Sequence, residues 1–193
     1  MTVRTGMQTL IDTVRAYANA GTAEWTIETD SSYKSYWDDE EIQRVLDRHR
    51  ADIVHYEMDP IQSYSAGGSV VYLSYDLGYG SIESGTAVFK IEDVDGTISG
   101  WTMDYTRGLA TFTTDTKGST YYWTGSTYDL YGAAADIWMI KAANVAKMFD
   151  FSTDGHSIKR SDLRRSYLDM ATYYKNMSPG GAVQSVKIIR SDV

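Results

Sequence analysis

Three histidines are the first residues of this chain whose type could support catalysis or metal binding. His49 and His55 lie six positions apart, which places them on different faces of a helix, so a shared metal ion is not expected. His156 follows an Asp-Gly turn, where a local hydrogen bond is the simpler role. The histidines therefore do not predict a metal site, and none is expected.

Acidic clusters are the second source of chemistry. The run Asp38, Asp39, Glu40 and Glu41 could gather a cation, but carboxylates at this point also favour the positive end of a helix. Two Asp-rich turns, at residues 93–96 and 150–155, resemble the start of a calcium loop but lack the remaining ligands at the required spacing. We interpret the run as a helix start and the other two as turns.

Nucleophilic and cofactor chemistry have no support in the sequence. The chain has no cysteine, no Gly-x-Ser-x-Gly elbow and no histidine near a suitable serine. Gly78-Tyr79-Gly80 is too short a match to a dinucleotide-binding fingerprint. We therefore expect that the protein is not an enzyme and binds no cofactor.

The charge of the chain is unevenly distributed. Residues 1–130 carry 9 Lys+Arg against 20 Asp+Glu, whereas residues 131–193 carry 9 against 6, for a net charge of -8. Tight DNA binding is not expected, because duplex affinity comes mainly from neutralised phosphates. An acidic wall could surround DNA loosely and let it slide, although solubility alone also explains the charge.

Helical periodicity appears on both sides of a central segment. Apolar residues recur at helical spacing over residues 6–19, 38–59, 129–149 and 161–177. Asp38 and Glu41 have capping-box spacing, and Ser161 is suited to cap the last helix. The most apolar helix contains Asp136 and Lys141, so no membrane span is expected.

Between these helices, residues 64–127 form short β-branched and aromatic runs separated by Gly-containing turns, which predicts a small antiparallel sheet of about four to six strands. The predicted fold is therefore a single α+β domain over residues 1–193. It consists of a helical bundle of about four helices (1–63 and 128–177), the β insertion (64–127) and an extended C-terminal arm (178–193). The arm follows Pro-Gly-Gly and has a strand-like pattern with no obvious partner in the chain.

Four segments carry a resemblance to a known family. They are WDDEEIQRVLDRHRADI (Trp37–Ile53), DYTRGLATF (Asp104–Phe112), YWTGSTYDLYGAAADIWMIKAA (Tyr122–Ala143) and FDFSTDGHSIKRSDLRRSYLDMATYY (Phe149–Tyr174). Their order and spacing resemble those of the head–tail connector proteins of tailed bacteriophages, also called adaptor or head-completion proteins. The β insertion is longer than in compact members of that family.

This resemblance implies a structural virion protein at the phage neck, made in the host cytoplasm. Such proteins form a ring of identical subunits, commonly twelvefold, that attaches to the portal protein, extends the DNA channel and provides the docking platform for tail or stopper proteins. The C-terminal segment of the family typically reaches into the portal ring. The resemblance thus implies that seven residues of the arm contact the portal: Ala182, Val183, Val186, Lys187, Ile188, Ile189 and Arg190. Asp38, Asp39, Glu40 and Glu41 are the candidates for an acidic surface facing the channel, in loose contact with passing DNA.

Two other functions stay open at this point. One is a β-rich binding module for carbohydrate or peptide, with an aromatic platform of Trp101, Tyr105, Tyr121, Tyr122 and Trp123. The other, a hydrolase with paired carboxylates, is the least favoured, because no acidic pair has a distinctive spacing.

Overall fold

The chain is described by a computed structural model that covers residues 2–21, 26–29, 32–35, 37–85, 89–146, 151–153, 156–158 and 160–179. Its helices are α1 (Gln8–Tyr17), α2 (Asp39–Asp47), α3 (Leu130–Ala146) and α4 (Arg160–Met177). The strands are β1 (Thr26–Thr29), β2 (Ser32–Ser35), β3 (Arg50–Glu57), β4 (Asp59–Tyr64), β5 (Val70–Asp76), β6 (Lys90–Asp93), β7 (Gly96–Thr97), β8 (Trp101–Asp104), β9 (Leu109–Phe112), β10 (Tyr122–Tyr128), β11 (Phe151–Thr153) and β12 (His156–Ile158). The predicted arm residues 182–190 lie outside the described ranges.

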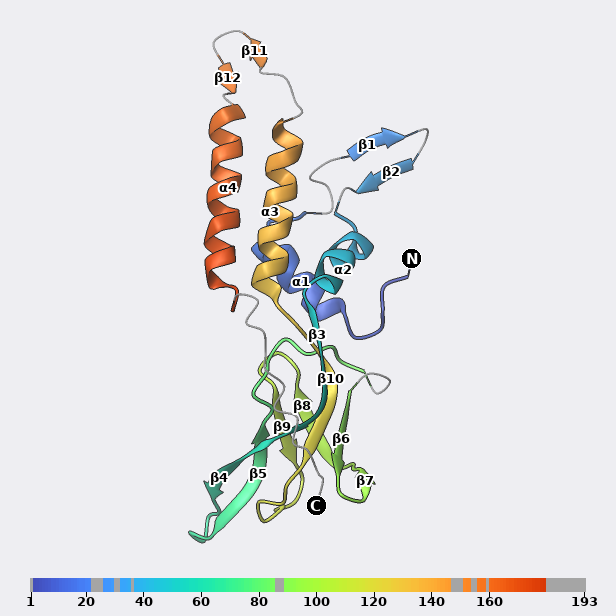
Figure 1. The fold of residues 1–193 in the computed structure, drawn as a ribbon, viewed down its shortest axis with the longest axis vertical. Helices are drawn as coiled ribbons and strands as arrows, with labels where there is room; N and C mark the ends of the chain where they lie inside the picture. The colour runs from blue at the N-terminus through green and yellow to red at the C-terminus, as the bar shows by residue number, and fades with distance from the viewer. Residues whose placement is uncertain are drawn as a thin grey trace, which may run out of the picture.

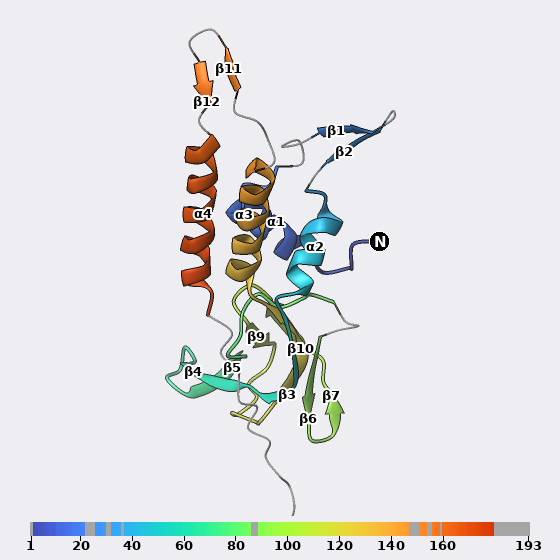
Figure 2. The same cartoon turned by 45° about the horizontal axis from the view of Figure 1, so that its top comes forward.

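The molecule is elongated, with a helical part at one end and a β part at the other (Figure 1). The β part contains two four-stranded antiparallel sheets, in the orders β3-β10-β6-β7 and β4-β5-β9-β8. The strands β3 and β10 connect this part to the helices, as the tilted view also shows (Figure 2). Two hairpins, β1-β2 and β11-β12, extend from the helical part.

The predicted helical bundle with a small inserted sheet is therefore wrong. The described residues are strand-rich, with two sheets that have a core of their own. The main error concerns residues 48–59, which were predicted to continue the second helix. That helix ends at Asp47, and the chain continues as β3 and β4. Ile53 and Tyr56 satisfy a helical period by position, but the β-branched and aromatic run around them pairs with β10 instead.

The other helix predictions agree with the structure to within a few residues. In α1 the residues Leu10, Ile11 and Val14 are buried, as the apolar period indicates. Asp38 is the N-cap of α2 and accepts a hydrogen bond from the Glu41 backbone N–H at 2.8 Å. Ser161 is not the N-cap of the last helix, because α4 already begins at Arg160.

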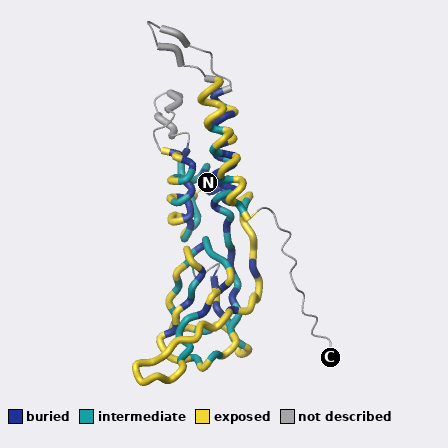
Figure 3. Tube along the Cα trace, turned by 90° about the vertical axis from the view of Figure 1, so that its left-hand side faces the viewer, coloured by how far each residue is buried: buried dark blue, intermediate teal, exposed yellow. Residues whose placement is uncertain are grey.

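Two separate apolar cores hold the two parts. The helical core is formed by α1, α2 and one side of α3, and the β core lies between the two four-stranded sheets around Trp123 and Tyr75. α3 is the central helix, because α1 and α2 pack on it as well as α4. α4 is buried only where it faces α3, and its outer face is exposed (Figure 3).

A buried lysine joins α1 to α3. Lys141 is 3% exposed, and its ammonium donates to the carbonyls of Ala18 and Asn19 at 2.9 Å, where α1 ends. The same ammonium lies 4.6 Å from the ring centre of Trp138. A cation at the negative end of a helix is favourable, and the aromatic ring adds to it, so this lysine serves the helical core.

Candidate functional site

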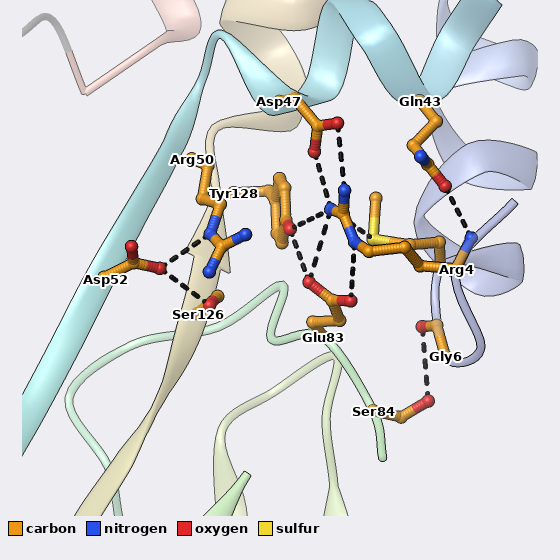
Figure 4. A network of polar contacts seen from close by, with 11 residues as sticks. Arg4, Gly6, Gln43, Asp47, Arg50, Asp52, Glu83, Ser84, Ser126 and Tyr128 are labelled. Atoms are coloured by element: carbon orange, nitrogen blue, oxygen red, sulfur yellow. Dashed lines mark hydrogen bonds and ion pairs between the residues drawn. The ribbon is translucent and has the colours of Figure 1, made fainter. Parts of the chain in front are cut away.

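The junction between the helical part and the β part contains a network of polar contacts (Figure 4). Arg4, in the segment before α1, is at its centre. Its guanidinium binds the Asp47 carboxylate in a bidentate manner, with N–O distances of 2.6 and 3.0 Å. Its Nε donates to Glu83 at 3.1 Å, and Nη2 donates to the Tyr128 hydroxyl at 2.8 Å. Arg4 thereby connects α2, the segment before β6, and β10.

Glu83 is the buried member of this group. It is 1% exposed, and its carboxylate accepts hydrogen bonds from Arg4 and from the Tyr128 hydroxyl, the latter at 2.5 Å. Burial raises the pKa of Tyr128 well above its usual value, and the hydrogen bond to Glu83 raises it further. The hydrogen bond with Asp47 raises the pKa of Arg4, with Glu83 adding to it against the opposing effect of burial. Arg4 therefore stays charged and Tyr128 neutral at physiological pH.

The backbone beside this group is equally constrained. Gly6 has φ +95°, and a Cβ built on it would lie 1.5 Å from the carbonyl oxygen of Ser84. The Ser84 hydroxyl and the Ser84 N–H both donate to the Gly6 carbonyl, at 3.2 and 3.4 Å. Only glycine allows this approach, so residues 4–6 clamp the segment 83–84 against the helical part.

A second pair of charges, Arg50 and Asp52, lies on β3 beside this network (Figure 4). Asp52 of β3 accepts from Arg50 at 2.6 Å and from the Ser126 hydroxyl of β10 at 2.8 Å. Burial would raise the pKa of Asp52, but the hydrogen bonds from Ser126 and Arg50 outweigh it, so that the pKa is lowered. This pair secures the upper end of β3 on β10.

A cavity of about 450 Å³ lies at the same junction. It is lined by the ends of several elements and by Pro179: Tyr17, His49, Ala51, Gly78, Tyr79, Gly80, Ser81, Thr127, Tyr128, Asp129, Leu130, Tyr131 and Pro179. Tyr17 stacks on Tyr131 at 5.4 Å and on Tyr174 at 5.8 Å between ring centres. Burial, followed by these two neighbours, raises the pKa of Tyr17. Stacked tyrosines therefore form part of the wall on the helical side.

The polar groups around the cavity are occupied by structural contacts. Asp129 caps α3 by accepting from the Gly132 N–H at 3.0 Å, and it also accepts from the Ser178 hydroxyl. His49 Nε2 lies 3.0 Å from the carboxylate of Asp136. The Ser178 hydroxyl is thus directed at a carboxylate rather than at the histidine, which is not the arrangement of a nucleophile and its base.

The acidic run predicted to face a channel has internal roles for two of its members. Asp38 caps α2, and Asp39 forms an ion pair with Arg15 of α1. Glu40 lies in the first turn of α2 with Asp39 and Glu41, where carboxylates stabilise the helix. These contacts explain the run locally and leave its proposed role toward DNA as a prediction.

The aromatic residues of the predicted binding platform do not form one exposed surface. Trp123 is fully buried in the β core, and its Nε1 donates to the Leu77 carbonyl at 3.2 Å. Trp101 and Tyr105 pack edge-on against Phe89. Tyr122 faces outward and stacks on His55 at 4.0 Å between ring centres. A ligand could not reach Trp123, one of the five residues of the predicted platform.

Neither a cluster of metal-ligating side chains nor a membrane-spanning helix occurs in the described part of the chain. No group of three or more His, Cys, Asp or Glu side chains that could hold a metal ion occurs in it. Within those same ranges, no helix is both long enough and apolar enough to cross a membrane.

Comparison with family models, curated proteins and solved structures gives no match to this chain.

Sequence reasoning missed the Arg4 group entirely. Its members are spread over the chain from Arg4 to Tyr128, and neither their types nor their spacing forms a motif. Gly6 was the available signal, because a glycine just before a helical pattern can indicate a close backbone approach.

Proposed function

We propose that this protein is a structural virion protein that forms a ring at the neck of a tailed phage. The ring attaches to the portal protein, extends the DNA channel and provides the docking platform for tail or stopper proteins. The proposal rests first on the order and spacing of the four segments that resemble head–tail connectors. The contacts at the junction support it indirectly, because the polar groups described there are used for structure rather than for chemistry.

The observation that carries the proposal is the exposed outer face of α4. This helix packs on α3 along one side, yet Leu168 and Tyr173 point elsewhere and are 37% and 56% exposed. A long helix covered on one side only, with exposed apolar side chains elsewhere on its surface, fits contact with a second copy. A ring requires that each subunit present two different surfaces to its neighbours, and α4 supplies one of them in this proposal.

The charge distribution gives each end of the subunit a role. The acidic residues, including Asp38 to Glu41, are proposed to contribute to a channel surface that repels DNA and so lets it pass. The net positive segment 131–193 is proposed to face the portal and neighbouring subunits. Its residues Ala182, Val183, Val186, Lys187, Ile188, Ile189 and Arg190 are the proposed portal contacts.

The direct test is to mix the purified protein with its portal and to image the mixture by electron microscopy. We expect rings that stack coaxially on the portal. Deletion of residues 182–193 should leave the far-UV circular dichroism spectrum unchanged and abolish attachment. A full-length protein that neither forms nor joins a ring would refute the proposed function, whereas a truncated chain that still attaches would refute only the role of the arm.

A second experiment tests the α4 surface. The double variant Leu168→Glu, Tyr173→Glu should weaken ring formation in sedimentation, because it places charge at two exposed apolar positions of α4. Val94→Glu is the matched control, because Val94 is 91% exposed on the turn between β6 and β7, far from α4 (Figure 1). Equal behaviour of the two variants would remove α4 from the proposed interface.

A further inference from the structure

The cavity at the junction has no role in the proposed function. Its volume of about 450 Å³ lies within the range of pockets that bind small molecules. It is bounded by α1, the start of α3, the segment after α4 and the first residues of β3, at the level where the helices meet the β part (Figure 1). A cavity between several elements is a common place for a ligand, and the chemistry of its wall indicates which ligand fits.

Four tyrosines line this cavity. They come from separate elements: Tyr17 from α1, Tyr79 from the segment after β5, Tyr128 from the end of β10 and Tyr131 from the first turn of α3. Burial raises the pKa of Tyr79, as it does that of Tyr17, so both hydroxyls stay protonated at physiological pH. Aromatic rings carry partial negative charge on their faces and attract cations. The tyrosines therefore favour a positively charged ligand over an anion.

The charge of the wall has the same sign. Among the described residues that line the cavity, Asp129 is the only carboxylate, and there is no lysine or arginine. The two donors to Asp129, the Gly132 N–H and the Ser178 hydroxyl, are neutral and leave its negative charge uncompensated. The imidazole of His49, which also lines the cavity, pairs through Nε2 with Asp136 instead. A bound cation would supply the missing counter-charge.

Backbone groups on the β side of the wall are already hydrogen-bonded within the protein. The Ser81 N–H donates to the Thr106 carbonyl at 3.1 Å, and the Ser81 carbonyl accepts from the Tyr128 N–H at 3.1 Å. The Thr127 hydroxyl donates to the Gly80 carbonyl at 2.6 Å. Anion sites are built from free N–H groups and cationic side chains, so these contacts argue against an anion as the ligand.

Close backbone contacts hold Tyr79 in its place. A Cβ built on Gly80 would lie 2.7 Å from the Thr106 carbonyl oxygen, and one on Gly108 would lie 1.6 Å from the Tyr79 carbonyl oxygen. Ser81 has φ +54°, a conformation that is unfavourable for a residue with a side chain. Strained backbone of this kind clusters at ligand sites, and a wall fixed before binding lowers the cost of binding.

We propose that the cavity binds a small organic cation with an alkylated ammonium group. Its alkyl groups contact the tyrosine rings, and its charge is compensated by the Asp129 carboxylate. An alkylated ammonium fits better than a bare one, which is compact and strongly hydrated. It also fits better than a metal ion, for which a single carboxylate supplies too few ligands. The site belongs to one subunit and does not depend on the proposed role in the virion.

Ligand-observed NMR of choline chloride with the full-length protein tests the proposal, because the methyl signal of choline broadens on binding. We expect a dissociation constant of about 1 mM or below. The matched probe is 3,3-dimethyl-1-butanol, which has the shape of choline without its charge and should bind at least about tenfold more weakly. Sodium chloride at the same concentration controls for ionic strength. Absence of choline binding at about 10 mM would overturn the proposal, and so would equal affinity for the two probes.

Variants locate the bound choline. Asp129→Asn removes the charge but keeps an oxygen that accepts from the Gly132 N–H, and it should weaken choline binding about tenfold. Asp59→Asn, the same change at an exposed carboxylate outside the cavity, should leave binding unchanged. Tyr131→Leu should weaken binding about fivefold, whereas Tyr131→Phe keeps the ring and should not. Far-UV circular dichroism checks that each variant is folded. Choline binding that neither Asp129→Asn nor Tyr131→Leu weakens would refute the site.

Discussion

Replacing Arg4 by alanine is expected to destabilise the protein by about 2–4 kcal/mol. Glu83 is 1% exposed, and the change leaves the Tyr128 hydroxyl as its remaining side-chain donor among the described residues. Removing one partner of a buried ion pair costs about 3–5 kcal/mol. Because the Arg4 side chain is 33% exposed, water can replace part of it, which reduces this contribution to about 2–3 kcal/mol. The exposed pair with Asp47 adds up to about 1 kcal/mol.

Urea unfolding, followed by circular dichroism and tryptophan fluorescence, measures this loss. Asp47→Ala is the matched control, because it removes the bidentate partner of Arg4 but leaves Glu83 paired, and it should cost about 1 kcal/mol or less. The double variant Arg4→Met, Glu83→Gln should be less destabilised than the sum of its single variants, by about 1–3 kcal/mol. If Arg4→Ala and Asp47→Ala cost the same, the buried carboxylate does not depend on Arg4 and the reasoning fails.

Three further predictions concern other positions. Gly6→Ala should lower the free energy of unfolding in urea by about 3 kcal/mol or more, because a Cβ would meet the Ser84 carbonyl. The control Gly96→Ala, also at positive φ but in open space, should lower it by about 1 kcal/mol. Equal losses in the two variants would exclude the clash. Lys141→Met should lower stability by about 2 kcal/mol through the lost hydrogen bonds to the end of α1, and a neutral result in the same assay would contradict that role. Because the pKa of Tyr128 is raised in the folded protein, the unfolded chain loses this proton first, and the free energy of unfolding should fall as the pH rises above about 10. In Tyr128→Phe, the free energy of unfolding measured between about pH 9 and 11 should fall less steeply. An unchanged slope would contradict this role of Tyr128.

The sequence predicted α1, α3, α4 and the start of α2 to within a few residues because their signals are local. Leu10, Ile11 and Val14 recur on one face of α1, and Asp38 caps α2 with its own side chain. The period over α3 also located that helix correctly, from Leu130 onward. In each case the deciding contacts lie within a few residues along the chain, which is the range over which periodicity and caps are informative.

The β part was underestimated because its deciding contacts are distant in sequence. Ile53 pairs with Gly125 and Tyr56 with Trp123, so the strand character of β3 depends on a partner far along the chain. A bulge at this point, where His55 has φ +51°, bends the strand so that it can continue into the second sheet as β4. No pattern within residues 48–59 indicates the pairing or the bulge, and the apolar residues there also fit a helical period.

The orientation of the two parts is set by the junction rather than by a shared core. The apolar clusters of the helical part and of the β part are separate, and β3 and β10 connect them. What fixes one part on the other is the clamp of residues 4–6 on Glu83 and Ser84. Polar contacts are directional, so a single substitution at Arg4 or Gly6 can change this orientation while both cores stay intact. In the proposed ring, closure depends on a fixed angle between neighbouring subunits, and the junction is then where a small change would prevent assembly without unfolding either part.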